Sequence, residues 1–235
     1  MALPALLFAL PLVTALILLV NRNPAVRNTL VRVSALLMGV LSVAVGVMYF
    51  GHPFKIGVDS PLVRFLMMAV DGLAALTVLY FCVKYKRYLT ALLGLAQFFL
   101  IVAFEFHAGS YARSVWDFNI DNLSIIMILI AGIIGGLIAV YSLGYMAVYH
   151  RKHVDVKDRR SFFFFVVFLF LSAMFGLVMS NNLLYMYTFW EITSLCSFLL
   201  IGYSGTNEAI HNSFKALWMN LLGGLAFATA ITYLG

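Results

Sequence analysis

The chain has 235 residues, of which 64% are hydrophobic and only 10% charged, and its mean hydropathy is +1.02. Because soluble domains are about half apolar and a quarter charged, this composition indicates a membrane protein, and no polar stretch is long enough to form a separate soluble domain. The net charge of +6 comes from basic residues spread among short loops, a distribution that argues against nucleic acid as a partner.

Apolar runs predict eight transmembrane helices, since about 20 residues are needed to cross a bilayer. The expected ranges are 2–20, 29–50, 62–83, 89–107, 121–145, 162–180, 183–204 and 207–234. Asp71 interrupts the third range, so a re-entrant pair is the alternative for the third and fourth. No basic residue precedes the first run and no small-residue cleavage motif follows it, which predicts a retained helix and not a signal peptide. The predicted fold is all-α, a polytopic transmembrane helix bundle of about eight helices.

Basic residues are distributed unequally between the two sides of this predicted bundle. One side has eleven of them and the other three, with Lys215 inside the membrane. The larger group is Arg22, Arg27, Arg32, Lys84, Lys86, Arg87, Arg151, Lys152, Lys157, Arg159 and Arg160, and the smaller is Lys55, Arg64 and Arg113. The positive-inside rule therefore predicts a multi-pass protein of the cell membrane, with the N-terminus outside and the basic loop 149–161 in the cytoplasm.

The sequence carries no signature of a cofactor. Cys82 and Cys196 both lie in apolar runs, so they indicate neither a disulfide framework nor a metal site. Haem, iron–sulfur and dinucleotide motifs are not found in the sequence. We therefore expect no metal, no cofactor and no catalytic residue, and any redox chemistry would take place in another subunit.

Glu191 lies about halfway along the predicted helix 183–204, at a depth where a charged group costs several kcal/mol. Residues three and four positions away share its face, and these are Tyr187, Thr188, Ser194 and Leu195. This short polar stripe is suited to hold a few water molecules, which favours a role in ion transfer. The alternative is structural, with Glu191 as a neutral acid that hydrogen bonds to a neighbouring helix.

Lys215 lies in the next apolar run, roughly 13 Å from the expected N-cap Thr206 at about 1.5 Å per residue. Glu208 follows in the first turn, where a negative charge interacts favourably with the helix dipole. Glu208, His211 and Lys215 have the spacing i, i+3 and i+7 and share one face, which predicts a proton path from the cytoplasmic surface. A solvated helix start explains Glu208 and His211 equally well, whereas Lys215 lies too deep for that explanation.

An acid and a base, Glu191 and Lys215, are thus expected near the middle of the membrane on consecutive helices. We expect them to be buried side by side as a coupled pair, in which the protonation of each depends on the charge of the other. A proton or cation added near one would then change the affinity of the other. Asp71 has no evident partner on its own helix. We expect it to pair with another chain or with the network around Glu191.

The same motifs resemble the antiporter-like subunits shared by respiratory complex I, the Mrp-type sodium/proton antiporters and membrane-bound hydrogenases. The resemblance begins at DFNIDNLSIIMILI (Asp117 to Ile130), continues through YSLGYM, and is strongest in NLLYMYTFWEITSLCSFLLIGYS and SFKALWMNLLGG. It divides the chain into N-terminal helices, residues 1–116, and an antiporter-like region, residues 117–235. It implies that Glu191 is the essential glutamate of the family's fifth helix and that Lys215 is the lysine that modulates it.

Two departures from the family pattern shape the expected assembly. Four helices precede the DNLS motif where the family has two, so the third and fourth, with Asp71, are interpreted as an insertion or a different N-terminal module. The family's proton path also uses a lysine on a following helix, a broken helix and a second repeat, which do not occur in this sequence. The resemblance therefore implies a membrane partner subunit that supplies the remaining helices and completes the channel.

These observations predict a proton- or sodium-translocating subunit of a multi-subunit energy-converting complex, similar to complex I or a membrane-bound hydrogenase. Such a subunit of a respiratory-chain oxidoreductase complex would itself carry out no redox step. Two alternatives stay open: an Mrp-type cation/proton antiporter subunit, and a membrane scaffold that conducts no ion. The expected ligands are H⁺ or Na⁺ and lipid, and carboxylates do not discriminate between the two ions.

Overall fold

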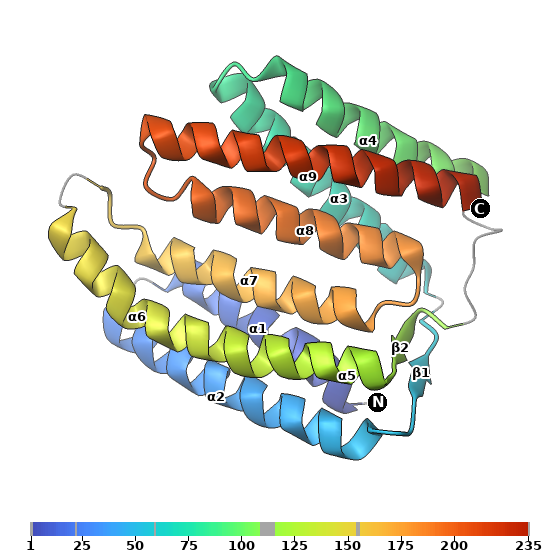
Figure 1. Cartoon of the computed structure of the whole chain (residues 1–235), viewed down its shortest axis with the longest axis horizontal. Coiled ribbons are helices and arrows are strands. Elements are labelled where there is room, and N and C mark those ends of the chain that lie inside the picture. The colour runs from blue at the N-terminus through green and yellow to red at the C-terminus, as the bar shows by residue number, and fades with distance from the viewer. Residues whose placement is uncertain (1, 22, 59, 109–115, 154–155, 235) are drawn as a thin grey trace.

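The structure is a computed structural model that describes residues 2–21, 23–58, 60–108, 116–153 and 156–234. Its helices are α1 (Ala2–Val20), α2 (Pro24–Tyr49), α3 (Pro61–Lys84), α4 (Tyr88–Ala108), α5 (Asn122–Leu129), the π-helical turn η1 (Ile130–Ile134), α6 (Gly135–Lys152), α7 (Arg160–Met179), α8 (Leu183–Ile201) and α9 (Asn207–Leu234). Because α5, η1 and α6 follow one another without a break, the described residues form eight helical rods, as predicted (Figure 1).

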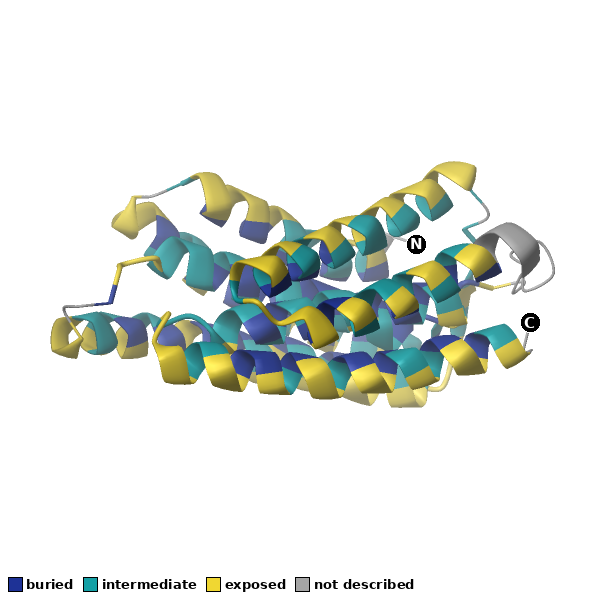
Figure 2. Ribbon diagram, turned by 90° about the horizontal axis from the view of Figure 1, so that it is seen from above, coloured by how far each residue is buried: buried dark blue, intermediate teal, exposed yellow. Residues whose placement is uncertain are grey.

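Seven of the rods in the described part of the chain are long and apolar enough to cross a membrane, and the apolar part of α4, Tyr88–Phe104, is shorter. The rods lie side by side with similar axis directions (Figure 1). Exposed positions follow the outer faces of the rods, and buried positions lie between them (Figure 2). Many of the exposed side chains are large and apolar, such as Leu36, Val47 and Leu137. A bilayer solvates such a surface, so the chain is a multi-pass membrane protein.

Local capping chemistry explains where several helices begin. The Asn23 side chain accepts a hydrogen bond from the Ala25 amide, and Pro24 occupies the first turn, so α2 starts five residues earlier than predicted. Asp121 caps α5 by accepting from the Ser124 amide at 2.7 Å, which lowers the pKa of this carboxyl group.

The predicted fifth helix is longer than the sequence indicated. It was expected to end at residue 145, but α6 continues to Lys152. Tyr149 and His150 belong to this extension, and both rings pack against Tyr203. Contact with the segment after α8 therefore holds the last two turns in helical form, and the polar composition that suggested a loop is explained by their position at the end of the bundle.

A two-stranded sheet lies at the end of the bundle where α3 begins and α4 ends. Strand β1 (Phe54–Ile56) precedes α3, strand β2 (Phe118–Ile120) precedes α5, and the two pair in antiparallel register with Lys55 opposite Asn119. The chain therefore leaves the bundle at β1, forms α3 and α4, and returns beside the point where it left (Figure 1). In the structure α3 and α4 are two long antiparallel helices packed on α8 and α9, so the re-entrant alternative is wrong. The division at residue 116 stays a prediction.

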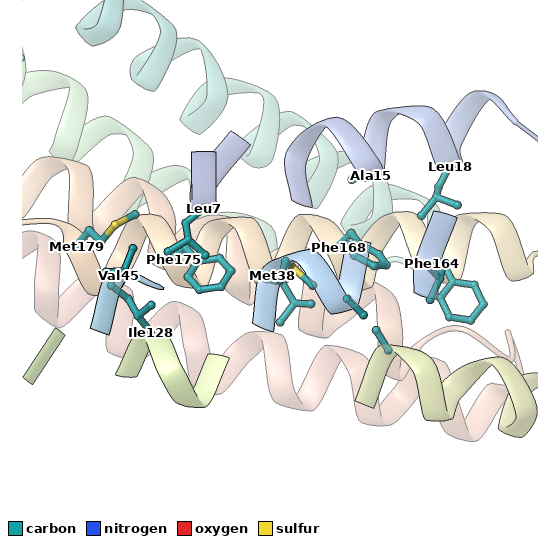
Figure 3. Packing of buried hydrophobic residues seen from close by; sticks show 14 of the residues in the cluster. Leu7, Ala15, Leu18, Met38, Val45, Ile128, Phe164, Phe168, Phe175 and Met179 are labelled. Carbon is teal, nitrogen blue, oxygen red and sulfur yellow. The ribbon is translucent and has the colours of Figure 1, made fainter. Parts of the chain in front are cut away.

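The bundle has two packing regions with α8 between them. In the first, α1, α2, α5–α6 and α7 enclose an apolar core whose largest members are Phe164, Phe168 and Phe175 (Figure 3). In the second, α3 and α9 pack against the other side of α8, and α4 packs on α3 and α9. Gly176 lets α7 approach α8 closely, because a Cβ at this position would overlap the Phe189 ring.

The connections with most basic residues, after α1, α3 and α6, gather at one end of the bundle, and β1 and β2 lie at the other (Figure 1). We refer to the first as the basic end. Arg22 and Arg113, which entered the charge comparison, lie outside the described residues. The orientation relative to the cytoplasm stays a prediction.

Candidate functional site

Five polar side chains meet at mid-length of the second packing region. Asp71 comes from α3, Gln97 from α4, and Tyr187, Thr188 and Glu191 from α8. Glu191 is eight residues from the start of α8, roughly 12 Å along its axis, and so lies about halfway through this 19-residue helix. We call these five residues the mid-membrane polar cluster.

Glu191 is held in this cluster by uncharged hydrogen-bond donors. The amide Nε2 of Gln97 donates to Glu191 Oε1. The Tyr187 hydroxyl, one turn back on α8, also interacts with Glu191 and with Gln97. The Glu191 side chain is partly buried, and the described residues place no lysine or arginine nitrogen within 4 Å of it. Its charge is therefore compensated by dipoles and not by a fixed cation.

Asp71 joins the same cluster through Thr188. The Thr188 hydroxyl oxygen lies 2.9 Å from Asp71 Oδ2 and 3.2 Å from the Leu184 carbonyl oxygen, so two acceptors compete for one proton. Tyr187 also interacts electrostatically with Asp71. Of the two possibilities that the sequence left open for Asp71, the structure supports contact with the network around Glu191.

Gln97 was missed by the sequence analysis. Its side chain is only 2% exposed and lies against Gly224 of α9, where a Cβ would overlap the Gln97 amide nitrogen. Its Oε1 atom is buried and has no hydrogen-bond partner in the described structure. A glutamine carries no charge, and a polar residue alone in an apolar run indicates little by itself. The available signal was that the amide stands near the middle of an otherwise apolar helix.

The face of α9 that carries Glu208, His211 and Lys215 points away from the cluster. All three side chains are exposed, and the buried face of α9 is formed instead by residues such as Phe214, Leu217 and Gly224. The expectation that Lys215 is buried beside Glu191 is therefore wrong for this chain, and its described residues form no Glu191–Lys215 ion pair. The reason is rotational, because Lys215 lies on nearly the opposite side of α9 from the glycine that contacts Gln97.

At the basic end, α9 begins as predicted. The Thr206 hydroxyl accepts a hydrogen bond from the Ala209 amide at 3.2 Å. His211 Nδ1 lies 3.4 Å from an Arg87 guanidinium nitrogen in the turn between α3 and α4. Glu208 and His211 are thus at an exposed helix start, which leaves both explanations of these two residues open.

A second polar group at the basic end joins α6, α7 and the segment after α8. His150 Nε2 lies 2.8 Å from the Tyr203 hydroxyl and 3.8 Å from an Asp158 carboxylate oxygen. Arg160 donates three hydrogen bonds to Asp158 at 2.7–3.0 Å. The hydrogen bond from Arg160 lowers the pKa of Asp158 to about 2, and burial raises the pKa of Tyr203. This group lies far from the middle of the helices and fixes their ends.

The chemistry available in the cluster is proton or cation exchange. The residues that the structure describes contain no group of three His, Cys, Asp or Glu side chains able to hold a metal ion. Cys82 and Cys196 are buried free thiols on α3 and α8. Carboxylates, an amide, a phenol and a hydroxyl can bind, release and relay protons.

The fold and the site define a polytopic α-helical membrane protein with ionisable groups inside its bundle. Residues 106–155 match the family described as NADH-Ubiquinone oxidoreductase (complex I), chain 5 N-terminus, and residues 180–234 match the family described as NADH:quinone oxidoreductase/Mrp antiporter, TM. Over these two ranges the chain is similar to the antiporter-like membrane subunits of complex I and of Mrp antiporters.

Curated relatives show the same similarity. The chain is 37% identical over 112 residues to the Na(+)/H(+) antiporter subunit A1 of Staphylococcus haemolyticus (strain JCSC1435), and 33% identical over 120 residues to the subunit A1 of Staphylococcus aureus (strain bovine RF122 / ET3-1). These matches cover 47% and 51% of this chain but only 13% and 14% of the relatives. The chain thus spans about one seventh of their length. The α3–α4 pair, which supplies Asp71 and Gln97, precedes both family matches.

Proposed function

We propose that this protein is a cation- or proton-translocating subunit of a multi-subunit membrane complex, and that Glu191 is its exchangeable ion site. The observation that carries the proposal is the setting of Glu191, which lies at mid-membrane depth among uncharged hydrogen-bond donors from α4 and α8. A buried carboxylate in hydrocarbon is costly unless it is paired. Without a fixed cation beside it, Glu191 is suited to bind a mobile one.

Gln97 makes both charge states of Glu191 possible. When Glu191 is ionised, the Gln97 amide nitrogen donates to it. When Glu191 is protonated, its hydroxyl group can donate to the buried Gln97 Oε1 atom if the amide rotates, because the amide carries donors on one atom and an acceptor on the other. A partner that serves both states lowers the barrier between them, as exchange requires.

Asp71 and Thr188 extend the cluster away from Glu191. The Thr188 hydroxyl donates to Asp71 when this acid is ionised. When Asp71 is protonated, the Thr188 hydroxyl can donate to the Leu184 carbonyl and accept from Asp71, so it serves both charge states of the acid. We propose Asp71 as a second proton carrier, supplied by the helix pair outside the family matches. Glu208 and His211 would form the entry at the basic end, next to Arg87.

Lys215 supports the assignment of a membrane partner. Its side chain is exposed on α9, eight residues from the helix start and roughly 12 Å along the axis. Trp218, Met219 and Leu222 are exposed on the same face. A lysine at this depth faces lipid at a cost, which falls when its side chain extends to the membrane surface or gains a protein or water partner. We propose that another membrane segment of the complex covers this face and brings an acid or water to Lys215, which then modulates the cluster at longer range.

The names of the curated relatives favour the antiporter alternative. Both are named Na(+)/H(+) antiporter subunits, whereas the family descriptions also include NADH:quinone oxidoreductase. We therefore propose an Mrp-type cation/proton antiporter subunit first and a redox-linked subunit, of complex I or hydrogenase type, second. A scaffold without conduction is disfavoured because it has no need for a carboxylate, an amide and a second acid in one buried cluster.

The test is ion translocation by the complex with and without the titratable group. Glu191→Gln keeps the size of the side chain and most of its hydrogen bonds. In everted vesicles that contain the assembled complex at matched amounts, we expect Na⁺-dependent collapse of a pH gradient to fall to background. Asp158→Asn is the control, because Asp158 is a half-exposed carboxylate outside the cluster and the proposed entry, and it should keep at least half of the wild-type rate. Equal transport by wild type and Glu191→Gln would overturn the proposal and favour the scaffold.

A further inference from the structure

A narrow apolar groove runs along the outside of the first packing region, between α2 and the η1–α6 part of the fifth rod. Its volume is about 610 Å³, and its lining is almost entirely apolar. Val43 and Gly132 lie near one end, Gly39 and Gly136 near the middle, and Arg32 at the other end. The groove is remote from the mid-membrane polar cluster, which lies on the far side of α8.

Glycines create the groove by letting two helices approach closely. A Cβ at Gly136 would lie 3.1 Å from the Ala35 carbonyl oxygen, and a Cβ at Gly132 would overlap the Ser42 side chain. Both glycines therefore bring the backbones of α2 and the fifth rod together and form the floor. Gly39 differs from them, because a Cβ there would have nothing within 4 Å. Its missing side chain leaves open space in the groove and is not required for helix packing.

The dimensions of the groove fit a hydrocarbon chain better than a helix. Arg32 and Val43 are eleven residues apart on α2, which is roughly 16 Å along the axis. Spread over that length, about 610 Å³ gives a mean cross-section of roughly 40 Å². A helix with its side chains is about 10–12 Å across, or roughly 80–110 Å². A transmembrane helix could thus rest on the rim of the groove but could not fill it, whereas extended acyl chains can.

Arg32 gives the groove a charged end. It is exposed, and its guanidinium has no hydrogen-bond or ion-pair partner among the described residues. Arg27, one and a half turns nearer the helix start, differs because it is only 7% exposed and packs on the Phe164 ring. Arg32 lies toward the basic end of the bundle, and a long basic side chain at this depth extends toward the membrane surface. Its natural counter-ion there is a lipid phosphate.

We propose that this groove is a binding site for an anionic phospholipid, with an acyl chain between Gly39 and Gly136 and the headgroup phosphate on Arg32. Apolar walls supply affinity for the chain, and the unpaired guanidinium supplies preference for a negatively charged headgroup. The inference is independent of the function proposed for Glu191.

Native mass spectrometry of the detergent-purified complex tests the site. The probes are dioleoyl phosphatidylglycerol and dioleoyl phosphatidylcholine, added separately at matched concentrations. For the wild type we expect at least one phosphatidylglycerol that survives collisional activation better than phosphatidylcholine does. Gly39→Leu places a side chain in the middle of the groove, at a position where a Cβ would have nothing within 4 Å. This variant should keep the fold and remove the adduct for both lipids. Arg32→Gln should keep an adduct but reduce the preference for phosphatidylglycerol about fivefold, the effect typical of one basic residue at a membrane surface.

Two matched controls separate this site from general lipid affinity. Gly144→Leu adds the same side chain at another glycine on α6 whose Cβ would have nothing within 4 Å, and Arg151→Gln removes an exposed positive charge outside the groove. Both should bind lipid as the wild type does. The proposal is overturned if Gly39→Leu retains the adduct, if Arg151→Gln loses as much preference as Arg32→Gln, or if a photo-crosslinker at Val40 reacts with a partner polypeptide in native membranes and not with lipid.

Discussion

The two packing regions on either side of α8 differ in the chemistry of their interiors. The first, formed by α1, α2, α5–α6 and α7, has a core of phenylalanines and aliphatic residues. Several of its polar groups are satisfied locally, whereas the buried Ser42 hydroxyl has no hydrogen-bond partner in the described structure. Of the satisfied groups, Thr14 and Ser34 hydrogen bond to each other at 2.8 Å, and Ser172 donates to the Phe8 carbonyl at 2.9 Å. The second region places two carboxylates and an amide between α3, α4 and α8. Under the proposed function, stability and ion chemistry belong to different parts of one bundle, and α8 takes part in both.

The largest expected effect on stability comes from the first region. Phe168 is fully buried on α7, so Phe168→Ala should destabilise the fold by about 3–5 kcal/mol through lost contacts and a new cavity. Glu191→Gln, in the second region, should change stability by less than about 1 kcal/mol because the shape is conserved. Reversible unfolding in bicelles measures both values. Similar losses for the two variants would show that the two regions are not separated as described.

Gly224→Ala adds a single methyl group to the interior of the second region. The added Cβ would overlap the Gln97 amide nitrogen and displace it from Glu191. Since a hydrogen bond to a charged group contributes about 1.5–3 kcal/mol, ion transport should fall about tenfold or more while the complex still assembles. Gly223→Ala is the control at the neighbouring position, where a Cβ would have nothing within 4 Å. If both variants transport like the wild type, the contact between Gln97 and Glu191 has no role in exchange.

Asp71→Asn tests the role of Asp71 in transport separately from the role of Glu191. If Asp71 relays protons through Thr188, Asp71→Asn and Thr188→Val should each slow transport a few-fold, and the double variant should be no slower than the slower single one, as expected for two residues of one pathway. Initial rates of ΔpH collapse between pH 6 and pH 9 provide the measurement. Additive losses in the double variant would place the two residues on separate paths.

The smallest effect is expected at the basic end, outside both cores. Because the folded-state pKa of Asp158 is lowered to about 2, its interaction with Arg160 stabilises the fold above the pKa of the unfolded state and is lost as the pH falls toward 2. The side chain of Asp158 is 51% exposed, so the contribution is that of a surface ion pair, under about 1 kcal/mol. Asp158→Asn should lower the unfolding midpoint slightly at pH 7, and the difference should shrink by pH 3. A difference that grows at pH 3 would contradict this assignment.

Several features were determined by the sequence alone because they depend on distance along one helix. The number of residues needed to cross a bilayer predicted the helical rods, and the depth of Glu191 followed from its place in an apolar run. The helical repeat put Tyr187 and Thr188 on the face of Glu191, where the structure shows them in contact with Gln97 and Asp71. The cap at Thr206 was also readable, because capping is a local hydrogen bond.

Only the tertiary structure decided which faces of these helices meet. Asp71 and Gln97 reach α8 because β1 and β2 return the α3–α4 pair to the bundle, and this pairing joins residues more than 60 positions apart. Lys215 points outward, although its position near the middle of the helix that follows Glu191 suggested a pair. In a soluble protein, apolar residues mark the buried face of a helix. In a bilayer, lipid is as apolar as the core, so the sequence of α9 could not show which of its faces would turn toward the cluster.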